Sequence, residues 1–287
     1  MKHESFIATP NSTIKLKNFD PKYSGSLDKK TAKLELQAGV ERLAAYQNVL
    51  YAQNSYALLI IFQAMDAAGK DSTIKHVMSG VNPQGCQVYS FKKPSDEELD
   101  HDYLWRSVRA LPERGRIGIF NRSYYEEVLV VRVHPELLAL QKLPPALNHK
   151  KIWDQRFEEI NNFEKYLVSN GIIILKFFLH VSKEEQKKRF LARINQPEKN
   201  WKFSTSDAKE RAAWDEYMTA YEAVFSNTST PWSPWHIIPA DQKWFTRLAV
   251  SNIICSKLES LNLAYPTMTQ QHQQDLLEAK KVLEQEP

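Results

Sequence analysis

The chain has 287 residues, of which 43% are hydrophobic and 25% charged, so it can bury a full core and is not composed like a disordered or fibrous protein. The formal net charge of +4 is only mildly basic and does not indicate a nucleic-acid binder. The two cysteines, Cys86 and Cys255, are far apart and argue against a disulfide scaffold and a zinc site. The amino-terminal residues contain no apolar stretch of signal-peptide length, which predicts a cytoplasmic protein with no membrane partner.

The first part of the chain alternates predicted helices and strands. Residues 1–28 mix Pro, Asn, Ser and Lys, as is typical of an extended arm. Apolar residues recur at helical spacing between Leu36 and Leu50 and predict an amphipathic helix over 29–51. A short apolar run predicts a parallel strand over 56–62, buried on both faces, and a helix follows over 71–79. Next we expect a strand over 87–91, a helix opened by a capping box at Ser95–Glu98, and a strand over 116–121; a second capping box, at Ser123–Glu126, predicts the next helix.

The second part continues the alternation after a connector at Pro144-Pro145. A helix is predicted over 149–169, the most apolar strand of the chain over 171–179, and another helix over 182–195. A further helix is expected to be capped at Asp207–Glu210, followed by a strand over 235–239 and a long helix over 241–261. This order predicts an α/β fold in which helices flank a central parallel sheet. We expect one domain over 29–265 and a tail over 266–287 that holds a surface helix or packing arm.

One predicted strand runs directly into a segment typical of phosphate-binding loops, at the start of a helix. The usual pattern is a glycine, four residues, and then Gly-Lys-Ser/Thr. Here Ala64 takes the first glycine position, Gly69 and Lys70 fit, and Asp71 replaces the hydroxyl residue. Backbone N–H groups and the positive end of the helix would converge on an anion. The candidate phosphate-binding residues are Ala67, Ala68, Gly69, Lys70, Asp71 and Ser72. The segment predicts a P-loop phosphotransferase.

The departures from the usual loop bear on its metal chemistry. The residue that Asp71 replaces ordinarily supplies the hydroxyl that holds Mg²⁺, so another ligand is needed. Asp66 would lie beside the phosphates, where it could hold the metal or orient an attacking phosphate oxygen. The alternative interpretation is an ordinary helix start with a solvated lysine and aspartate.

The segment from Phe62 to Thr73 resembles the phosphate loop of the polyphosphate kinase 2 family. Further segments are similar to that family in the expected order, namely Asn82-Pro83, Leu104-Trp-Arg106, Phe120 to Val128, Asn195 to Lys202 and Ile238 to Asp241. The resemblance runs from about residue 19 to 266 and implies a three-layer α/β/α P-loop kinase fold, similar to thymidylate kinase, with a helical lid at about 183–215. It implies transfer of phosphoryl groups between inorganic polyphosphate and AMP or ADP to give ADP or ATP, with GMP and GDP as further candidates. The implied metal is Mg²⁺, with Mn²⁺ as a second candidate, and the implied assembly is a homo-oligomer, either a dimer or a tetramer.

The resemblance also implies which residues form the active centre. It places Asn121 and Arg122 there, and a guanidinium is suited to bidentate contact with phosphate. It places an acidic pair, Glu126 and Glu127, nearby for metal or phosphoryl handling. The capping box offers a structural explanation for Glu126, and relatives often carry Asp at the position of Glu127. Asp66 and Glu127 are the expected metal ligands.

Several basic residues are candidates for binding a polyanion, which needs a groove of cations rather than one pocket. Arg189 and Arg193 lie four apart on one helix face, which we expect to point away from the core. Lys199 and Lys202 follow in a loop that resembles the family's lid, which closes on phosphates and excludes water. Four more residues could extend the groove or be ordinary surface charges: Lys75, Arg106, Arg116 and Arg132.

Two other functions are compatible with these residues. A nucleoside monophosphate kinase that uses ATP as donor would have the same fold and loop. A non-catalytic module that binds polyphosphate or nucleotide would explain why Ala64, Asp71 and Asn121 depart from the general pattern. Within the kinase hypotheses, direct in-line transfer and a phosphoenzyme on one of the acids are both open.

Overall fold

A five-stranded, all-parallel sheet forms the centre of the computed structural model, which describes residues 3–147 and 151–286. The strands lie in the spatial order β2 (Cys86–Ser90), β3 (Ile117–Asn121), β1 (Ala57–Gln63), β4 (Ile172–His180) and β5 (Trp235–Pro239). This confirms the predicted α/β fold with a parallel sheet, and each predicted strand forms within a residue or two of its expected ends.

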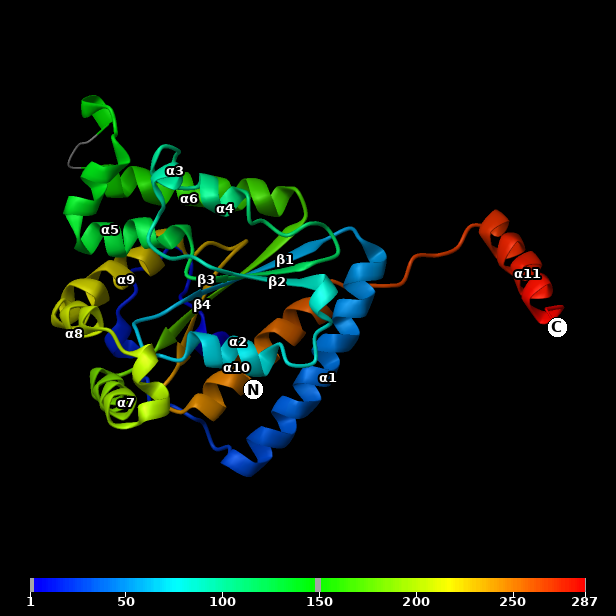
Figure 1. The fold of residues 1–287 in the computed structure, drawn as a ribbon, viewed down its shortest axis with the longest axis horizontal. Helices are drawn as coiled ribbons and strands as arrows, with labels where there is room; N and C mark the ends of the chain where they lie inside the picture. The colour runs from blue at the N-terminus through cyan, green and yellow to red at the C-terminus, as the bar shows by residue number, and fades with distance from the viewer. Residues whose placement is uncertain (1–2, 148–150, 287) are drawn as a thin grey trace.

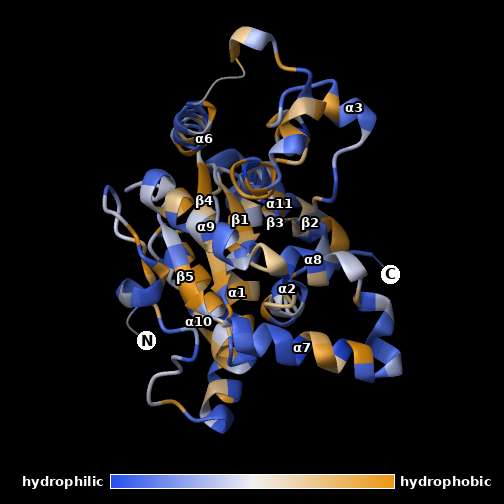
Figure 2. Cartoon of the chain, turned by 90° about the vertical axis from the view of Figure 1, so that its left-hand side faces the viewer, coloured by the Kyte–Doolittle hydropathy of each residue, from blue (hydrophilic) through white to orange (hydrophobic). Residues whose placement is uncertain are grey.

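Helices cover both faces of the sheet and make three layers (Figure 1). One face carries α1 (Lys29–Gln53), α2 (Lys70–Val77) and α10 (Lys243–Glu259), which pack on one another. The other carries α5 (Val130–Val133), α6 (Ile152–Ser169) and α9 (Trp214–Thr228). Because both faces are covered, all seven residues of β1 are buried, and the strands form an apolar centre between more polar helices (Figure 2).

Two predicted helices are broken into shorter pieces. The helix expected from Ser95 forms as α3 (Asp96–Leu99), with the predicted capping box, and α4 (Trp105–Val108). The helix expected from Ser123 is a 3₁₀ turn, η4 (Tyr124–Val128), followed by α5 and η5 (Pro135–Gln141). The second capping box is wrong, because the Glu126 carboxylate faces Arg122 at 3.7 Å, while the Ser123 hydroxyl accepts from the Tyr125 N–H. Tertiary contacts replace the local motif here.

The segment predicted as the lid consists of α7 (Lys183–Asn195), η7 (Pro197–Lys202) and α8 (Thr205–Ala212). The last of these helices begins earlier than predicted, because Ser204 caps it and Asp207 is the third-residue partner of that capping box. The sequence predicts one helix in this region, whereas the structure contains a second helix, α9, directly after α8. The expected first residues of α6, 149 and 150, lie outside the described residues.

The two ends of the chain behave differently. The amino-terminal arm, with η1 (His3–Phe6) and η2 (Leu16–Asn18), packs against the edge of the sheet, where the Ala8 N–H donates to the Trp235 carbonyl at 2.9 Å. The predicted tail helix forms as α11 (Gln270–Glu284), exposed along its length and projecting away from the body (Figure 1). Short 3₁₀ turns, η3 (Pro83–Gly85) and η6 (Pro145–Leu147), lie in connections. Within the described residues, no helix is long and apolar enough to cross a membrane.

Candidate active site

The carboxyl ends of β1 and β3 meet at one edge of the sheet. Phe62 on β1 is in register with Asn121 on β3, so the loop after β1 and the Asn121-Arg122 turn lie side by side. Strands on either side of β1 are reached by connections that go in opposite directions, which makes this edge a topological switch point, where α/β proteins commonly bind ligands. The sheet therefore brings together the two segments that the sequence singled out.

The loop from Ala64 to Gly69 curls around the amino end of α2. Ala67 and Gly69 have φ angles of +61° and +111°, in or near the left-handed region, and Gly69 is the residue immediately before the helix. The buried Lys70 ammonium donates to the Ala64 carbonyl at 2.9 Å across the loop. Burial and the nearby Arg122 cation lower the Lys70 pKa below its ordinary value. An anion in the loop would offset both effects.

Carboxylates and Arg122 form an ion-pair cluster beside the loop. The Arg122 guanidinium lies 3.0 Å from Asp66 and 3.7 Å from Glu126. The charge of Glu126, supported by Asp66, raises the Arg122 pKa against the opposing effect of burial. The Asn121 amide donates to Asp71 at 2.7 Å. Five of the six predicted catalytic residues thus lie at this edge of the sheet: Asp66, Lys70, Asn121, Arg122 and Glu126.

Arg122 has a φ of +64°, which is uncommon for a residue with a side chain. Its N–H donates to the Phe62 carbonyl at 3.0 Å, and the next residue, Ser123, accepts from the buried Gln63 amide at 3.1 Å. Such a conformation persists only where the surroundings fix it, and it is common at functional sites.

Glu127 lies with different partners. Its buried carboxylate accepts from Arg156 Nε at 3.0 Å and from the Gln141 amide at 2.6 Å. Burial raises the Glu127 pKa, while Arg156 opposes that rise. The structure thus separates Glu127 from the cluster around Asp66, and its role as a metal ligand stays a prediction.

The donor set near the loop fits Mg²⁺ bound jointly by protein and substrate. Among residues 3–147 and 151–286, no three His, Cys, Asp or Glu side chains gather as a metal site. Mg²⁺ usually keeps several waters and is held by one or two carboxylates together with substrate phosphates. Asp66 is a carboxylate placed for this, and its partner Arg122 is itself suited to phosphate.

Arg189 donates hydrogen bonds to the backbone of the phosphate loop. We expected it to point away from the core, but it is buried, and its guanidinium donates to the carbonyls of Ala67, Ala68, Ala240 and Asp241 at 2.7–3.0 Å. Its Nε donates to Glu185 at 2.8 Å. Every guanidinium nitrogen is thereby engaged with protein, so this structure gives Arg189 the role of anchoring the loop rather than the predicted phosphate contact.

We predict that Arg189→Lys loosens the loop, because an ammonium cannot reproduce the planar fork that bridges two chain segments. The free energy of unfolding should fall by about 1–3 kcal/mol, as buried carbonyls lose charged donors. Urea denaturation measures the change, with the exposed Lys188→Arg on the same helix as control. Equal stability of the two variants would contradict the anchoring role.

Contacts within the predicted lid segment tie its parts together. Arg193 Nη1 donates to the Lys202 carbonyl at 3.1 Å and lies 3.3 Å from the Asp207 carboxylate. Burial, followed by the negative charge of Asp66, raises the Asp207 pKa. The side chains of Lys199 and Lys202 are exposed, and Lys202 lies over the Trp201 ring.

The four groove candidates lie in different places. Arg106 lines a hollow of about 560 Å³ next to Ser90, whose hydroxyl is 3.4 Å from the Asn121 amide. Lys75 is exposed on α2. Arg132 stacks on the Phe157 ring at 5.7 Å. Arg116 precedes β3 and pairs with Glu113 at the opposite end of that strand from Asn121, so the structure moves Arg116 out of the predicted groove.

The hollow beside Ser90 combines cations with aromatic rings. Lys92, Lys93 and Arg109 line it together with Arg106, and Tyr89, Phe91 and Trp105 supply the rings. One carboxylate, Glu98, also lines the hollow and lies 3.6 Å from the Arg106 guanidinium. Arg106 lies over the Phe91 ring at 5.3 Å. Such a mixture suits a ligand with both phosphate and a flat ring.

A second basic group, which the sequence did not predict, lies near the loop. Arg247 Nη2 on α10 donates to the Ser72 hydroxyl at 2.7 Å, and Lys243 lies one turn earlier on that helix. Burial, followed by the charges of Arg189 and Arg247, lowers the Lys243 pKa. The sequence could have predicted this group, because the helix that follows the last parallel strand must start at the same edge of the sheet as the phosphate loop. Basic residues in the first turns of that helix are therefore candidates for the site.

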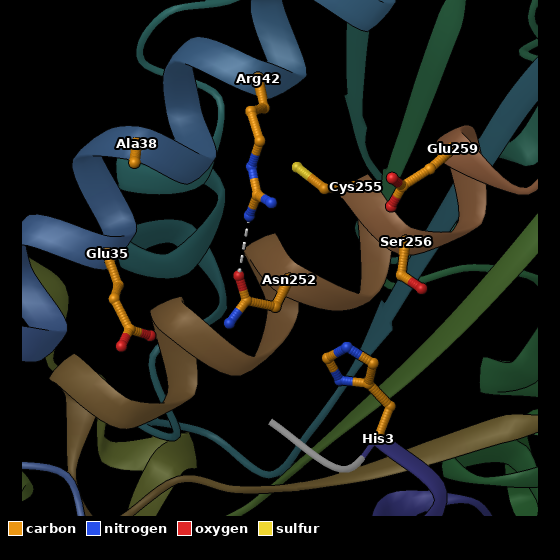
Figure 3. A pocket seen from close by; sticks show the side chains of 8 residues that line it. All are labelled: His3, Glu35, Ala38, Arg42, Asn252, Cys255, Ser256 and Glu259. Atoms are coloured by element: carbon orange, nitrogen blue, oxygen red, sulfur yellow. Dashed lines mark hydrogen bonds between the residues drawn. The ribbon is translucent and has the colours of Figure 1, made fainter.

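A second hollow, of about 520 Å³, lies between α1 and α10 (Figure 3). Arg42 and Asn252 face each other across it at 3.4 Å, but Glu35 and Glu259 also line it. Two carboxylates would repel a phosphate chain, so the hollow beside Ser90 is the better candidate for a phosphorylated ligand.

Comparisons with known proteins agree with this geometry. The model of the family "Polyphosphate kinase 2 (PPK2)" matches residues 26–266. An ADP-polyphosphate phosphotransferase of Rhodopseudomonas palustris is 57% identical over 249 residues, covering 86% of each chain. An AMP/ADP-polyphosphate phosphotransferase of Meiothermus ruber is 43% identical over 265 residues, covering 92% of this chain and 95% of the relative. The crystal structure of polyphosphate kinase 2 from Arthrobacter aurescens TC1 superposes with a TM-score of 0.85 at 38% identity, covering 95% of this chain and 98% of that one. This chain belongs to the polyphosphate kinase 2 family.

Proposed function

We propose that this protein is a phosphotransferase that moves phosphoryl groups between inorganic polyphosphate and the adenine nucleotides AMP and ADP. The observation that carries the proposal is the meeting of the phosphate loop, including Asp66, with Arg122 and Asn121 at one edge of the sheet. The names of the similar proteins from Rhodopseudomonas palustris and Meiothermus ruber support the choice of donor and acceptor.

The two substrates would approach the reaction centre from different sides. The terminal phosphate of polyphosphate would bind the N–H groups at the start of α2 and Lys70. The nucleotide would lie in the hollow beside Ser90, with its phosphates near Lys92 and Arg106 and its base against the aromatic wall. Asn121 lies between the two positions, since it contacts both Asp71 and Ser90.

The chain's own residues would do little acid–base chemistry. Lys70 and Arg122 would offset the charge that spreads over the transferred group, and the loop would hold that group in line with the attacking oxygen. When bound, Mg²⁺ or Mn²⁺ would be held by the Asp66 carboxylate and would neutralise negative charge on the phosphates. Direct transfer is the simpler route, because it needs positioning and charge stabilisation alone.

A donor and acceptor panel tests the proposal. Polyphosphate or ATP is supplied as donor, and AMP, ADP, GMP or GDP as acceptor, each with Mg²⁺, and products are quantified by chromatography. We expect ADP and ATP to form from polyphosphate. Turnover with ATP but not with polyphosphate would instead favour a nucleoside monophosphate kinase, and tight polyphosphate binding without turnover would favour a binding module. Sedimentation of the same sample tests the prediction of a homo-oligomer.

A further inference from the structure

A charged pair is buried between strand β4 of the sheet and helix α6. The Lys176 ammonium on β4 lies 2.6 Å from the Glu164 carboxylate on α6, and both side chains are fully buried. Lys176 faces β1 on one side and Trp235 of β5 on the other, in register with Ile61. A lone charge in such a place would be strongly disfavoured, so the pair needs complete hydrogen bonding.

The pair is fully satisfied, and two of its partners come from the segment that follows Arg122. Lys176 donates to Glu164, to the Tyr125 hydroxyl at 3.0 Å and to the Thr228 carbonyl at 2.7 Å. The other Glu164 oxygen accepts from the Tyr124 and Tyr125 hydroxyls at 2.9 and 2.7 Å. Both rings are buried, and Tyr125 also packs edge-on against Trp235.

Stability alone does not explain this arrangement. Buried ion pairs can often be replaced by apolar side chains of similar volume without loss of stability, because the desolvation cost offsets the attraction. The pair also fixes orientation, because the Glu164 carboxylate accepts hydrogen bonds from the hydroxyls of two consecutive tyrosines. Arg122 and Glu126 flank those tyrosines, and Arg122 holds a left-handed backbone conformation that neighbouring contacts must impose.

We propose that Lys176 and Glu164 are positioning residues, whose buried network with Tyr124 and Tyr125 orients Arg122 and Glu126 toward the phosphate loop. The tyrosines connect the network to Arg122 and Glu126, so its removal should slow the chemical step and leave substrate capture nearly intact. This inference rests on the phosphoryl transfer proposed above.

The decisive variant replaces the whole network with apolar side chains: Glu164→Leu, Lys176→Met, Tyr124→Phe and Tyr125→Phe together. We expect a thermal midpoint within about 5 °C of the parent, because the donors and acceptors of the four side chains are removed together, although the Thr228 carbonyl loses its Lys176 donor. The kcat should fall about 10- to 100-fold, as expected when a reacting group is misplaced by about an ångström. The KM for polyphosphate should change by less than about threefold.

A second readout does not depend on activity. Limited trypsin digestion, followed by mass spectrometry, reports how often the chain around Arg122 opens, and we expect faster cleavage after Arg122 in the variant. Leu258→Ala, at a fully buried position on α10, is the matched control. It should lower the thermal midpoint but, at a temperature where it stays folded, leave kcat and cleavage after Arg122 at the parent values.

The outcomes separate the two proposals. A folded apolar variant with the parent's kcat and the parent's cleavage after Arg122 would overturn the positioning role. If that variant does not fold, Tyr124→Phe with Tyr125→Phe, which keeps the ion pair and both rings, decides by the same two readouts. If the parent protein shows no turnover with any donor, the phosphotransferase proposal fails, and cleavage after Arg122 alone decides whether the network holds this segment.

Discussion

Replacing Lys70 by alanine is expected to lower kcat for ATP formation from polyphosphate and ADP by roughly 10²- to 10³-fold, the loss seen when one preorganised transition-state donor is removed. The ammonium is buried and held over the loop by the Ala64 carbonyl, so it is already in place when an anion arrives. Charge on the transferred group would then develop against a fixed cation. Initial rates of ATP formation, measured at saturating polyphosphate and Mg²⁺, give the effect.

The matched control for this variant is Lys33→Ala, which removes an exposed lysine from α1. Both variants delete the same side chain and one positive charge, so the difference between them reports on position alone. Thermal unfolding of both should remain cooperative. An active Lys70→Ala protein with the parent's kcat would mean that the loop does not contact the transferred phosphate.

Replacing Asp66 by asparagine is expected to raise the Mg²⁺ concentration needed for half-maximal activity by about 10- to 100-fold, the range observed when a group supporting a metal site is lost. The substitution keeps the shape of the side chain but removes the negative charge that, on our proposal, would attract the metal. It also removes one of the two carboxylates that hold Arg122, leaving Glu126 at 3.7 Å. Rates measured across a Mg²⁺ titration, repeated with Mn²⁺, show the shift.

The control for Asp66→Asn is Asp275→Asn on the exposed helix α11, which is remote from the loop in the fold (Figure 1). It should reproduce the parent's Mg²⁺ curve. A parent-like Mg²⁺ curve for Asp66→Asn, accompanied by a lower kcat, would assign Asp66 to orienting Arg122 instead of binding metal.

Much of the candidate active site could be predicted from local sequence patterns. The apolar run of β1 is buried on both faces, so its composition alone predicts a parallel strand, and the loop that follows it has to lie at the carboxyl edge of the sheet. Asn121 and Arg122 end the neighbouring strand at the same edge, and the structure brings both to the loop. The resemblance to the family implied that both residues belong to the active centre, and the parallel direction of the strands explains why they lie at the same edge as the loop.

The directions in which charged side chains point could not be predicted from local sequence patterns. Arg189 and Glu127 are charged residues in segments that the sequence had assigned to phosphate or metal, yet one bonds to loop carbonyls and the other to Arg156. Whether a charged side chain turns toward a ligand or toward protein depends on partners distant in sequence. The partners Ala240 and Arg156 come from other elements, and no local spacing reveals them.

By itself, the sequence determined the alternation of strands and helices, the phosphate loop and the family, because these depend on short-range hydrophobic pattern, turn chemistry and motif order. The tertiary structure alone decided which charges meet. It broke the helix expected after Ser123, placed Arg247 beside Ser72, and showed that Lys176, which only interrupts an apolar strand in the sequence, pairs with Glu164 beneath the tyrosines. The physical reason is that electrostatic and hydrogen-bond partners are chosen by proximity in space, which the packing of distant elements sets.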